Sequence, residues 1–267
     1  MLGHSERGQA IRAHRYGDFS SPWTILVVGC IHGDECEGFA ITRRLARGPH
    51  PAGLDLWIVH SLNPDGRRLG LRVNGRGVDL NRNFGSEWRE SGRRWDPEYS
   101  GPRPWSERET RLARRLVLRA RPDVTIWYHQ PQNVVRAWGG SRATARRYAR
   151  LAGEEYRSIR WPNGTAPNWQ NHTFPGAASF VVELPAGSLA DGRAARHARA
   201  VRRLLQLPVA RPDLIEAIAP DRPSASNPRS AVPVPAPCRR GSGPAARPRR
   251  RRSRRPPRPA EAARSRR

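Results

Sequence analysis

The sequence contains no lysine, and this absence decides how its charge is interpreted. All 49 basic residues are arginine, against 23 acidic residues, and the formal net charge is +26. Such basicity is typical of proteins that bind nucleic acid or another polyanion. In the body of the chain, however, the arginines are scattered rather than gathered on one face. We therefore attribute most of the charge there to a compositional preference for arginine.

Cysteine is also scarce, with Cys30, Cys36 and Cys238 as the three in the chain. Their small number and irregular spacing exclude a disulfide framework and a zinc–thiolate cluster. We expect Cys30 to pack as a small hydrophobic side chain at the end of a strand, and Cys36 to do the same at the start of the next helix.

Long apolar runs are absent as well. No run approaches the length needed to span a membrane. The first residues, Met1 to Gly8, are polar and lack the apolar segment of a secretory signal. The sequence as written therefore predicts a cytoplasmic protein, or a secreted one if the true start lies upstream and carries an export signal. Nothing in the sequence indicates the oligomeric state.

Apolar runs alternate with helical patterns over most of the chain. Strands are predicted by apolar, β-branched runs at residues 25–28, 54–60, 124–129 and 179–184. Helices are predicted at residues 38–47, 106–120, 141–155 and 191–207, and long loops at residues 67–104 and 157–174. This alternation predicts an α/β fold, with a sheet that helices cover on both faces.

The composition changes at about Ala219, beyond which Pro, Ser, Ala and Arg dominate. Residues 239–267 contain 13 arginines and a single acidic residue, Glu261. Such a segment cannot bury enough apolar surface to fold. We therefore expect one folded domain at residues 1–218 and a disordered Pro/Arg-rich tail at residues 219–267.

Chemically useful side chains stand at the ends of three predicted strands. His32 and Glu35 follow the first strand, His129 ends the third, and Glu183 lies near the end of the fourth. Sites in α/β sheets form at the carboxyl ends of strands, so these side chains are expected to meet. Two histidines, one glutamate and a water make up the usual hydrolytic zinc site. Taken singly, each residue also fits a solvated turn, a half-buried histidine or an arginine-paired carboxylate.

Glu183 is placed for general acid/base chemistry beside such a metal. Zinc polarises a carbonyl and lowers the pKa of its bound water. A free carboxylate must then take the proton and pass it to the leaving amine. The loop at residues 67–104 adds Arg72, Asn81 and Arg82, whose guanidinium and amide groups suit carboxylate recognition. The alternative for these arginines is a solvated loop in an arginine-rich chain.

An ordered set of motifs resembles the zinc metallocarboxypeptidase (carboxypeptidase A-like) family over roughly residues 1–207. The motifs are His32-Gly33-Asp34-Glu35, Asn63-Pro64-Asp65-Gly66, Gly77-Val78-Asp79-Leu80-Asn81-Arg82-Asn83-Phe84, Tyr99-Ser100-Gly101-Pro102, Ser106-Glu107-Arg108-Glu109-Thr110, His129 and Val182-Glu183-Leu184-Pro185. Among the branches of the family, the chain is most similar to the murein peptide amidase A branch.

The resemblance implies a fold and a role for each matching residue. It implies a single catalytic domain with a mixed, mostly parallel sheet flanked by helices, and one zinc ion per chain. The implied roles are zinc ligation by His32, Glu35 and His129, catalysis by Glu183, binding of the substrate's terminal carboxylate by Asn81 and Arg82, and polarisation of the scissile carbonyl by Arg72.

One part of the family pattern is missing. Many members carry a mobile tyrosine, in a loop before the last strand, that closes over the substrate. The corresponding region here, Arg160 to Gly164, has no tyrosine. Either Trp161 closes the site instead, or Trp161 is a surface aromatic packed under a loop and the lid is built differently.

The implied function is hydrolysis of the amide bond before a carboxylate-bearing terminal residue of a peptide. The resemblance to murein peptide amidases favours cell-wall peptides, cut at the γ-D-glutamyl–diaminopimelate bond. An alternative is a zinc deacylase of N-acyl amino acids, similar to aspartoacylase or succinylglutamate desuccinylase. A rival of another class is a polyanion-binding protein that contacts nucleic acid non-specifically through its tail, although that tail has no aromatic residues for stacking on bases.

Overall fold

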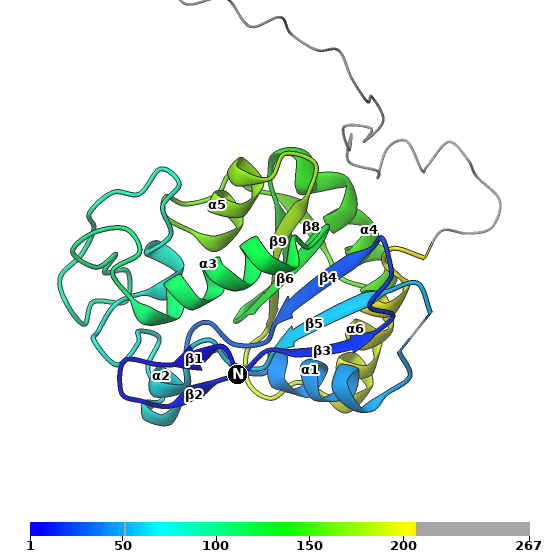
Figure 1. The fold of residues 1–267 in the computed structure, drawn as a ribbon, viewed down its shortest axis with the longest axis horizontal. Coiled ribbons are helices and arrows are strands. Elements are labelled where there is room, and N and C mark those ends of the chain that lie inside the picture. Colours follow the sequence, from blue (N-terminus) through cyan, green and yellow to red (C-terminus); the bar gives the residue numbers. More distant parts are fainter. Residues whose placement is uncertain (51, 207–267) are drawn as a thin grey trace, which may run out of the picture. The chain divides into compact units, whose positions relative to one another are not determined.

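In the computed structural model, which describes residues 1–50 and 52–206, a seven-stranded sheet forms the centre of the fold (Figure 1). Its strand order is β3-β5-β4-β6-β9-β7-β8. The strands are β3 (His14–Gly17), β4 (Thr24–Val28), β5 (Asp55–Val59), β6 (Val124–His129), β7 (Gln132–Ala137), β8 (Tyr156–Ser158) and β9 (Ala178–Pro185). Two short strands, β1 (Gly3–His4) and β2 (Ala10–Ile11), pair separately. The predicted tail at residues 219–267 lies outside the described residues.

Strands β5, β4, β6 and β9 run parallel to one another at the centre of the sheet. Strand β3 pairs antiparallel with β5, and β7 pairs antiparallel with β9. The predicted mixed, mostly parallel sheet is therefore confirmed. Every residue of β4 and β6 is buried, because helices cover both faces. Strands buried on both sides need apolar residues at nearly every position, which is why their sequence signal is strong.

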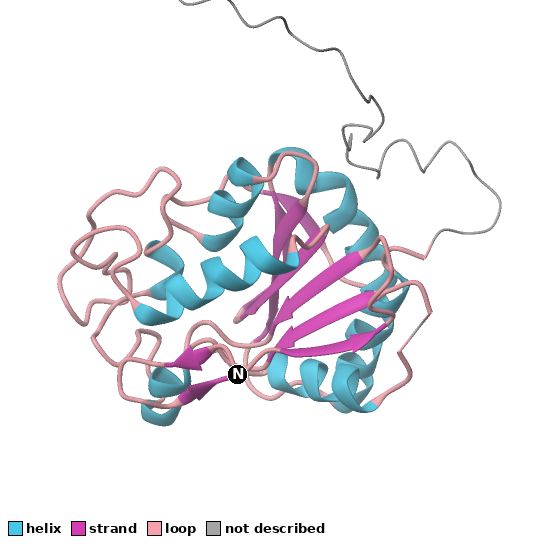
Figure 2. Ribbon diagram, in the orientation of Figure 1, coloured by secondary structure: helices cyan, strands magenta, loops and turns pink. Residues whose placement is uncertain are grey.

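Helices lie on both faces of this sheet, as predicted (Figure 2). They are α1 (Gly38–Arg47), α2 (Pro64–Leu69), α3 (Arg108–Ala120), α4 (Arg142–Ala152), α5 (Ala166–Thr173) and α6 (Asp191–Arg203), with the 3₁₀ turns η1 (Leu80–Arg82) and η2 (Gly139–Ser141). Helix α6 packs against both α1 and α4 on one face, while α3 and α5 cover the other (Figure 1). Within the described residues, none of these helices combines the length and apolarity needed to cross a membrane.

Helix α5 corrects the prediction of a continuous loop at residues 157–174. Its apolar pattern is weak, so periodicity gave no helical signal. Its first turn is instead stabilised from a distant part of the chain, because the Asn81 side chain accepts a hydrogen bond of 2.9 Å from the Ala166 backbone N–H. Such a bond satisfies one of the otherwise unpaired N–H groups at a helix start. A cap that comes from another segment is invisible in the local sequence.

Two buried glutamates at the start of α3 fasten the long loop to the domain. The Asn74 amide donates hydrogen bonds to Glu107 at 2.9 Å and to Glu109 at 3.2 Å. Glu109 also accepts a bond of 3.0 Å from the backbone N–H of Glu6. Both carboxyl groups are fully buried. Burial raises the pKa of Glu109 to about 7, so this side chain holds a proton in mildly acidic solution.

The raised pKa of Glu109 predicts a specific pH dependence of stability. Since the folded protein binds this proton more tightly than the unfolded chain, the stabilisation is complete below about pH 4.5 and is lost as the pH rises through 7. The loss amounts to roughly 3 kcal/mol. Urea unfolding at pH 5 and pH 8 should therefore show a smaller drop in the free energy of unfolding for Glu109→Gln than for the parent. Glu90→Gln, at an exposed position, is the matched control; equal drops in all three proteins would contradict the assignment.

Candidate metal centre and substrate cavity

The parallel strands bring the predicted ligands to one edge of the sheet. His32 and Glu35 lie in the turn that joins β4 to α1, and His129 is the last residue of β6. Glu183 lies directly beside His129 in the register of β6 and β9. Because the carboxyl ends of neighbouring parallel strands share an edge, residues almost a hundred positions apart become neighbours.

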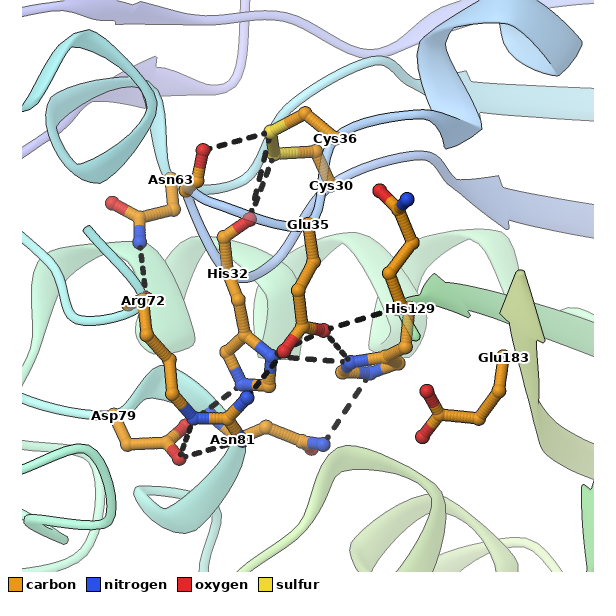
Figure 3. A network of polar contacts seen from close by, with 12 residues as sticks. Cys30, His32, Glu35, Cys36, Asn63, Arg72, Asp79, Asn81, His129 and Glu183 are labelled. Atoms are coloured by element: carbon orange, nitrogen blue, oxygen red, sulfur yellow. Dashed lines mark hydrogen bonds and ion pairs between the residues drawn. A yellow bond between two sulfur atoms is a disulfide. The ribbon is translucent and has the colours of Figure 1, made fainter. Parts of the chain in front are cut away.

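Three donor atoms converge at this edge, as Figure 3 shows. The Glu35 Oε2 atom lies 2.9 Å from His32 Nδ1 and 2.9 Å from His129 Nδ1. The two Nδ1 atoms are 3.1 Å apart. Zinc bonds of 2.0–2.1 Å in a tetrahedral arrangement separate two ligand atoms by roughly 3.3 Å. The donor set therefore fits a small tetrahedral metal ion with little rearrangement, and its chemistry is that of a hydrolytic zinc site.

The charges of the donors also suit a metal. Burial alone would raise the pKa of Glu35, but its contacts with His129 and His32 hold that pKa well below its usual range. Burial lowers the pKa of His129, which favours the neutral imidazole. Burial works in the same direction at His32, but the Asp79 carboxylate outweighs it and raises the pKa of His32. A metal binds the ionised carboxylate and the neutral imidazole, so it would displace a proton mainly from His32.

Asp79 is a site residue that sequence reasoning missed. It is fully buried, and its Oδ1 atom lies 3.0 Å from His32 Nε2, on the side of the ring away from the three donors. A carboxylate in this position fixes the orientation of a metal-binding imidazole. The signal was present, because Asp79 lies in the same motif as Asn81 and Arg82. Nothing in the sequence, however, shows that this loop passes behind His32.

Arg72 lies against the same group of residues (Figure 3). Its guanidinium donates to Glu35 through Nη1, and its Nε donates to Asp79 at 3.1 Å and to the Pro97 carbonyl at 2.9 Å. Arg72 is thus held beside the Glu35 carboxylate and lines the same cavity.

Asn81 and Arg82 face the cavity from the turn η1. Asn81 uses its side-chain oxygen to cap α5, which fixes the direction of its amide group. The Arg82 guanidinium donates to the backbone carbonyl of Asn81 at 3.0 Å and to the Glu98 carboxylate at 2.7 Å. Glu98 is 68% exposed. Solvent-exposed ion pairs contribute little free energy, so a substrate carboxylate can replace this partner at small cost.

All the predicted site residues line one cavity of about 350 Å³. They are His32, Glu35, Arg72, Asn81, Arg82, His129, Trp161 and Glu183. Trp161 is 6% exposed and lines this cavity, and its role as a lid stays a prediction.

Glu183 stands apart from the hydrogen-bonded network of the three donors (Figure 3). Its Oε1 atom accepts a long contact of 3.4 Å from Arg136, and its Oε2 atom is buried without a hydrogen-bond partner among the described residues. A buried carboxylate oxygen is costly to leave unpaired. Such a group is therefore well suited to accept a proton from a molecule that enters the cavity.

The structure also corrects the interpretation of two cysteines. Cys30 and Cys36 form a disulfide, with their Cα atoms 4.8 Å apart, instead of packing as separate hydrophobic side chains. The turn that carries His32 and Glu35 brings the two sulfur atoms together, and only the folded turn reveals this. The cross-link closes a loop that contains His32 and Glu35, and it reduces the number of conformations that this segment can adopt in the unfolded chain.

The chain is similar to known proteins in sequence and in fold. Residues 52–178 match the family described as zinc carboxypeptidase. Murein peptide amidase A of Escherichia coli strain K12 is 34% identical over 117 residues, which cover 40% of this chain and 48% of the relative. The chain thus spans about half the length of the curated relatives it matches.

Solved structures show the same likeness. The murein-tripeptide amidase of Escherichia coli O157 superposes with a TM-score of 0.62 at 25% identity, covering 79% of this chain and 92% of that one. Carboxypeptidase A from Helicoverpa armigera gives a TM-score of 0.63 at 19% identity, covering 76% and 66%. The chain therefore has the carboxypeptidase fold, and residues 52–178 match the zinc carboxypeptidase family. Residues 52–178 include Arg72 and His129, whereas the turn with His32 and Glu35 precedes them and Glu183 follows.

The contact between Asp79 and His32 predicts a loss of metal affinity in Asp79→Asn. Removing a carboxylate behind a metal-binding imidazole typically weakens metal binding about 10- to 100-fold. Competition with a chromogenic zinc chelator measures this directly. Asp191→Asn is the matched control, because Asp191 is 91% exposed on α6. An unchanged zinc affinity in Asp79→Asn would show that Asp79 does not orient a metal ligand.

Proposed function

We propose that this protein is a zinc-dependent metallopeptidase that hydrolyses the amide bond before a terminal residue with a free carboxylate. The observation that carries this proposal is the convergence of His32, Glu35 and His129 in one cavity with the unpaired carboxylate of Glu183. The zinc carboxypeptidase match and the likeness to murein peptide amidases support the same reaction class.

In this proposal, His32, Glu35 and His129 would hold the metal. A bound zinc ion supplies a Lewis acid, which polarises the scissile carbonyl and makes the attacking water acidic near neutral pH. Asp79 fixes the His32 ring from behind. Burial of the three ligands keeps bulk water from competing for their lone pairs.

Glu183 acts as the general acid and base. Its unpaired oxygen takes a proton from the attacking water and delivers it to the nitrogen of the leaving amine, so that the amide bond breaks without release of an unstable amide anion. Its place beside His129 in the sheet holds the carboxylate next to the metal ligands. Arg72 stabilises the negative charge that develops on the carbonyl oxygen.

Asn81 and Arg82 bind the terminal carboxylate of the substrate. The planar guanidinium of Arg82 offers two parallel N–H donors to the two carboxylate oxygens, and the Asn81 amide adds a directional donor. This requirement for a free carboxylate makes the enzyme act at the end of a chain. Trp161 forms part of the cavity wall and contacts the departing residue.

The likeness to murein peptide amidases favours cell-wall peptides as substrates. The bond cut would be the γ-D-glutamyl–diaminopimelate amide, because diaminopimelate carries the free carboxylate that Asn81 and Arg82 bind. Rates of hydrolysis distinguish this assignment from two others. A murein amidase should prefer a murein tripeptide, a general carboxypeptidase should prefer a standard C-terminal peptide, and a deacylase should prefer N-acyl amino acids.

The metal and Glu183 are each required in this mechanism. A strong chelator should abolish hydrolysis of the murein tripeptide, and added zinc should restore it. Glu183→Gln should lower kcat by about 10²- to 10⁴-fold, because it removes the general base, while one zinc ion per chain is retained. Glu155→Gln, at an exposed position, should leave kcat unchanged. Full activity after metal removal, or in Glu183→Gln, would refute the mechanism.

Binding of the terminal carboxylate predicts a second pair of results. A substrate with a C-terminal amide should be cleaved about 10- to 100-fold less efficiently by kcat/KM, since it loses a charge-assisted hydrogen bond. Arg82→Gln should lower the efficiency on the free acid and narrow the difference between acid and amide. Arg89→Gln, at an exposed position of the same loop, should keep the parental difference in kcat/KM between the free acid and the amide. If Arg82→Gln and the parent show the same ratio of kcat/KM between the free acid and the amide, another residue binds the terminal carboxylate.

A further inference from the structure

A third arginine lines the cavity without a role in the mechanism above. Arg136 lies on β7, opposite Val181 of β9 in the antiparallel register. Its side chain is 17% exposed, and both Arg136 and Val181 line the cavity. Arg136 therefore brings a largely buried positive charge to the wall formed by β7 and β9, whereas Arg72 and Arg82 come from the loop on residues 67–104.

The three cavity arginines differ in how fully they are paired. Arg72 is bound by Glu35 and Asp79, and Arg82 by Glu98 at 2.7 Å. Among the residues that the structure describes, the side chain of Arg136 makes only long contacts from its Nη1 atom, of 3.3 Å to Gln132 and 3.4 Å to Glu183. Its Nε–H is buried and has no hydrogen-bond partner among the described residues.

An unpaired guanidinium donor inside a cavity is costly unless a ligand supplies an acceptor. The contact with Glu183 does not meet this need. On β7, the residue directly opposite Glu183 is Val134. Arg136 lies further along β7 and therefore reaches Glu183 only diagonally and through a single nitrogen. A guanidinium has five N–H donors, and its planar edge fits a carboxylate with two parallel bonds. Enough donors remain for a second carboxylate.

We propose that Arg136 is a specificity-determining residue that binds a second carboxylate, carried by the side chain of the terminal residue. The proposal rests on the proposed function, in which Asn81 and Arg82 hold the main-chain carboxylate of that residue. Val181 offers an apolar surface to the intervening methylene groups. The preferred terminal residue is then dicarboxylic, either an acidic amino acid or diaminopimelate with its side-chain carboxylate.

Peptides that differ only in their last side chain test this proposal. The full-length, zinc-loaded parent should cleave a peptide ending in glutamate about 10- to 100-fold more efficiently than one ending in glutamine, mainly through KM. In Arg136→Gln this ratio should fall close to one, and Arg136→Lys should restore part of it. Arg157→Gln, which removes an exposed arginine from neighbouring β8, should keep the parental ratio. A peptide ending in diaminopimelate shows whether that residue behaves like glutamate.

Two results would overturn the inference. One is a parent that prefers glutamine or lysine at the terminus. The other is an Arg136→Gln variant that loses activity equally on all peptides through kcat, which would make Arg136 a positioning residue for Glu183.

A binding measurement separates this inference from the proposed function. Calorimetric titration of the zinc-loaded protein with free glutamate and free glutamine requires no catalysis. Tighter binding of glutamate that disappears in Arg136→Gln supports the inference even if no peptide is hydrolysed, in which case the proposed function alone has failed. Equal binding of both amino acids by the parent would contradict the inference even if peptides are hydrolysed.

Discussion

The parallel pairing of β4, β6 and β9 is the constraint on which the site depends. It places the ends of β4 and β6 at one edge, and its register sets His129 beside Glu183. These strands are held by burial on both faces, where each fully buried Val, Leu or Ile side chain contributes about 1.5–3 kcal/mol. The apolar core therefore positions polar groups that no local interaction would bring together. A shift of one residue in this register would point Glu183 to the opposite face of the sheet.

The long loop on residues 67–104 adds the second half of the site and is held by contacts that are themselves polar. Asn74 ties it to the glutamates of α3, and Asn81 caps α5. Near Arg82 the loop meets Gly164 closely: a Cβ added to this glycine would lie 2.3 Å from the Arg82 carbonyl oxygen, and its φ of +66° is one that other residues rarely adopt. The loop is therefore shaped by its neighbours, which explains how an irregular segment can hold Arg72, Asp79 and Arg82 in fixed places.

The sequence allowed the central strands, most of the helices and the identities of the cavity residues to be predicted, because buried strands and family motifs leave local patterns. It did not reveal contacts that depend on the path of the chain. Strand β7, which begins with two exposed polar residues and has a short apolar run, was missed, and with it the position of Arg136. Asp79 was passed over because its partner, His32, is 47 residues away. The Cys30–Cys36 disulfide and helix α5 also depend on contacts that form only in the folded chain. The folded turn brings the two cysteines together, and the distant Asn81 side chain caps the helix.

The central claim is that two histidines and one glutamate hold a single zinc ion at the edge of the sheet. X-ray absorption spectroscopy at the zinc edge, on the full-length protein loaded with one equivalent of zinc, tests it most directly. The account predicts a shell of nitrogen and oxygen atoms at about 2.0–2.1 Å, with the outer-shell scattering of two imidazole rings and no sulfur. Sulfur at about 2.3 Å, which would require a cysteine thiolate, or scattering from fewer than two imidazoles, would contradict it.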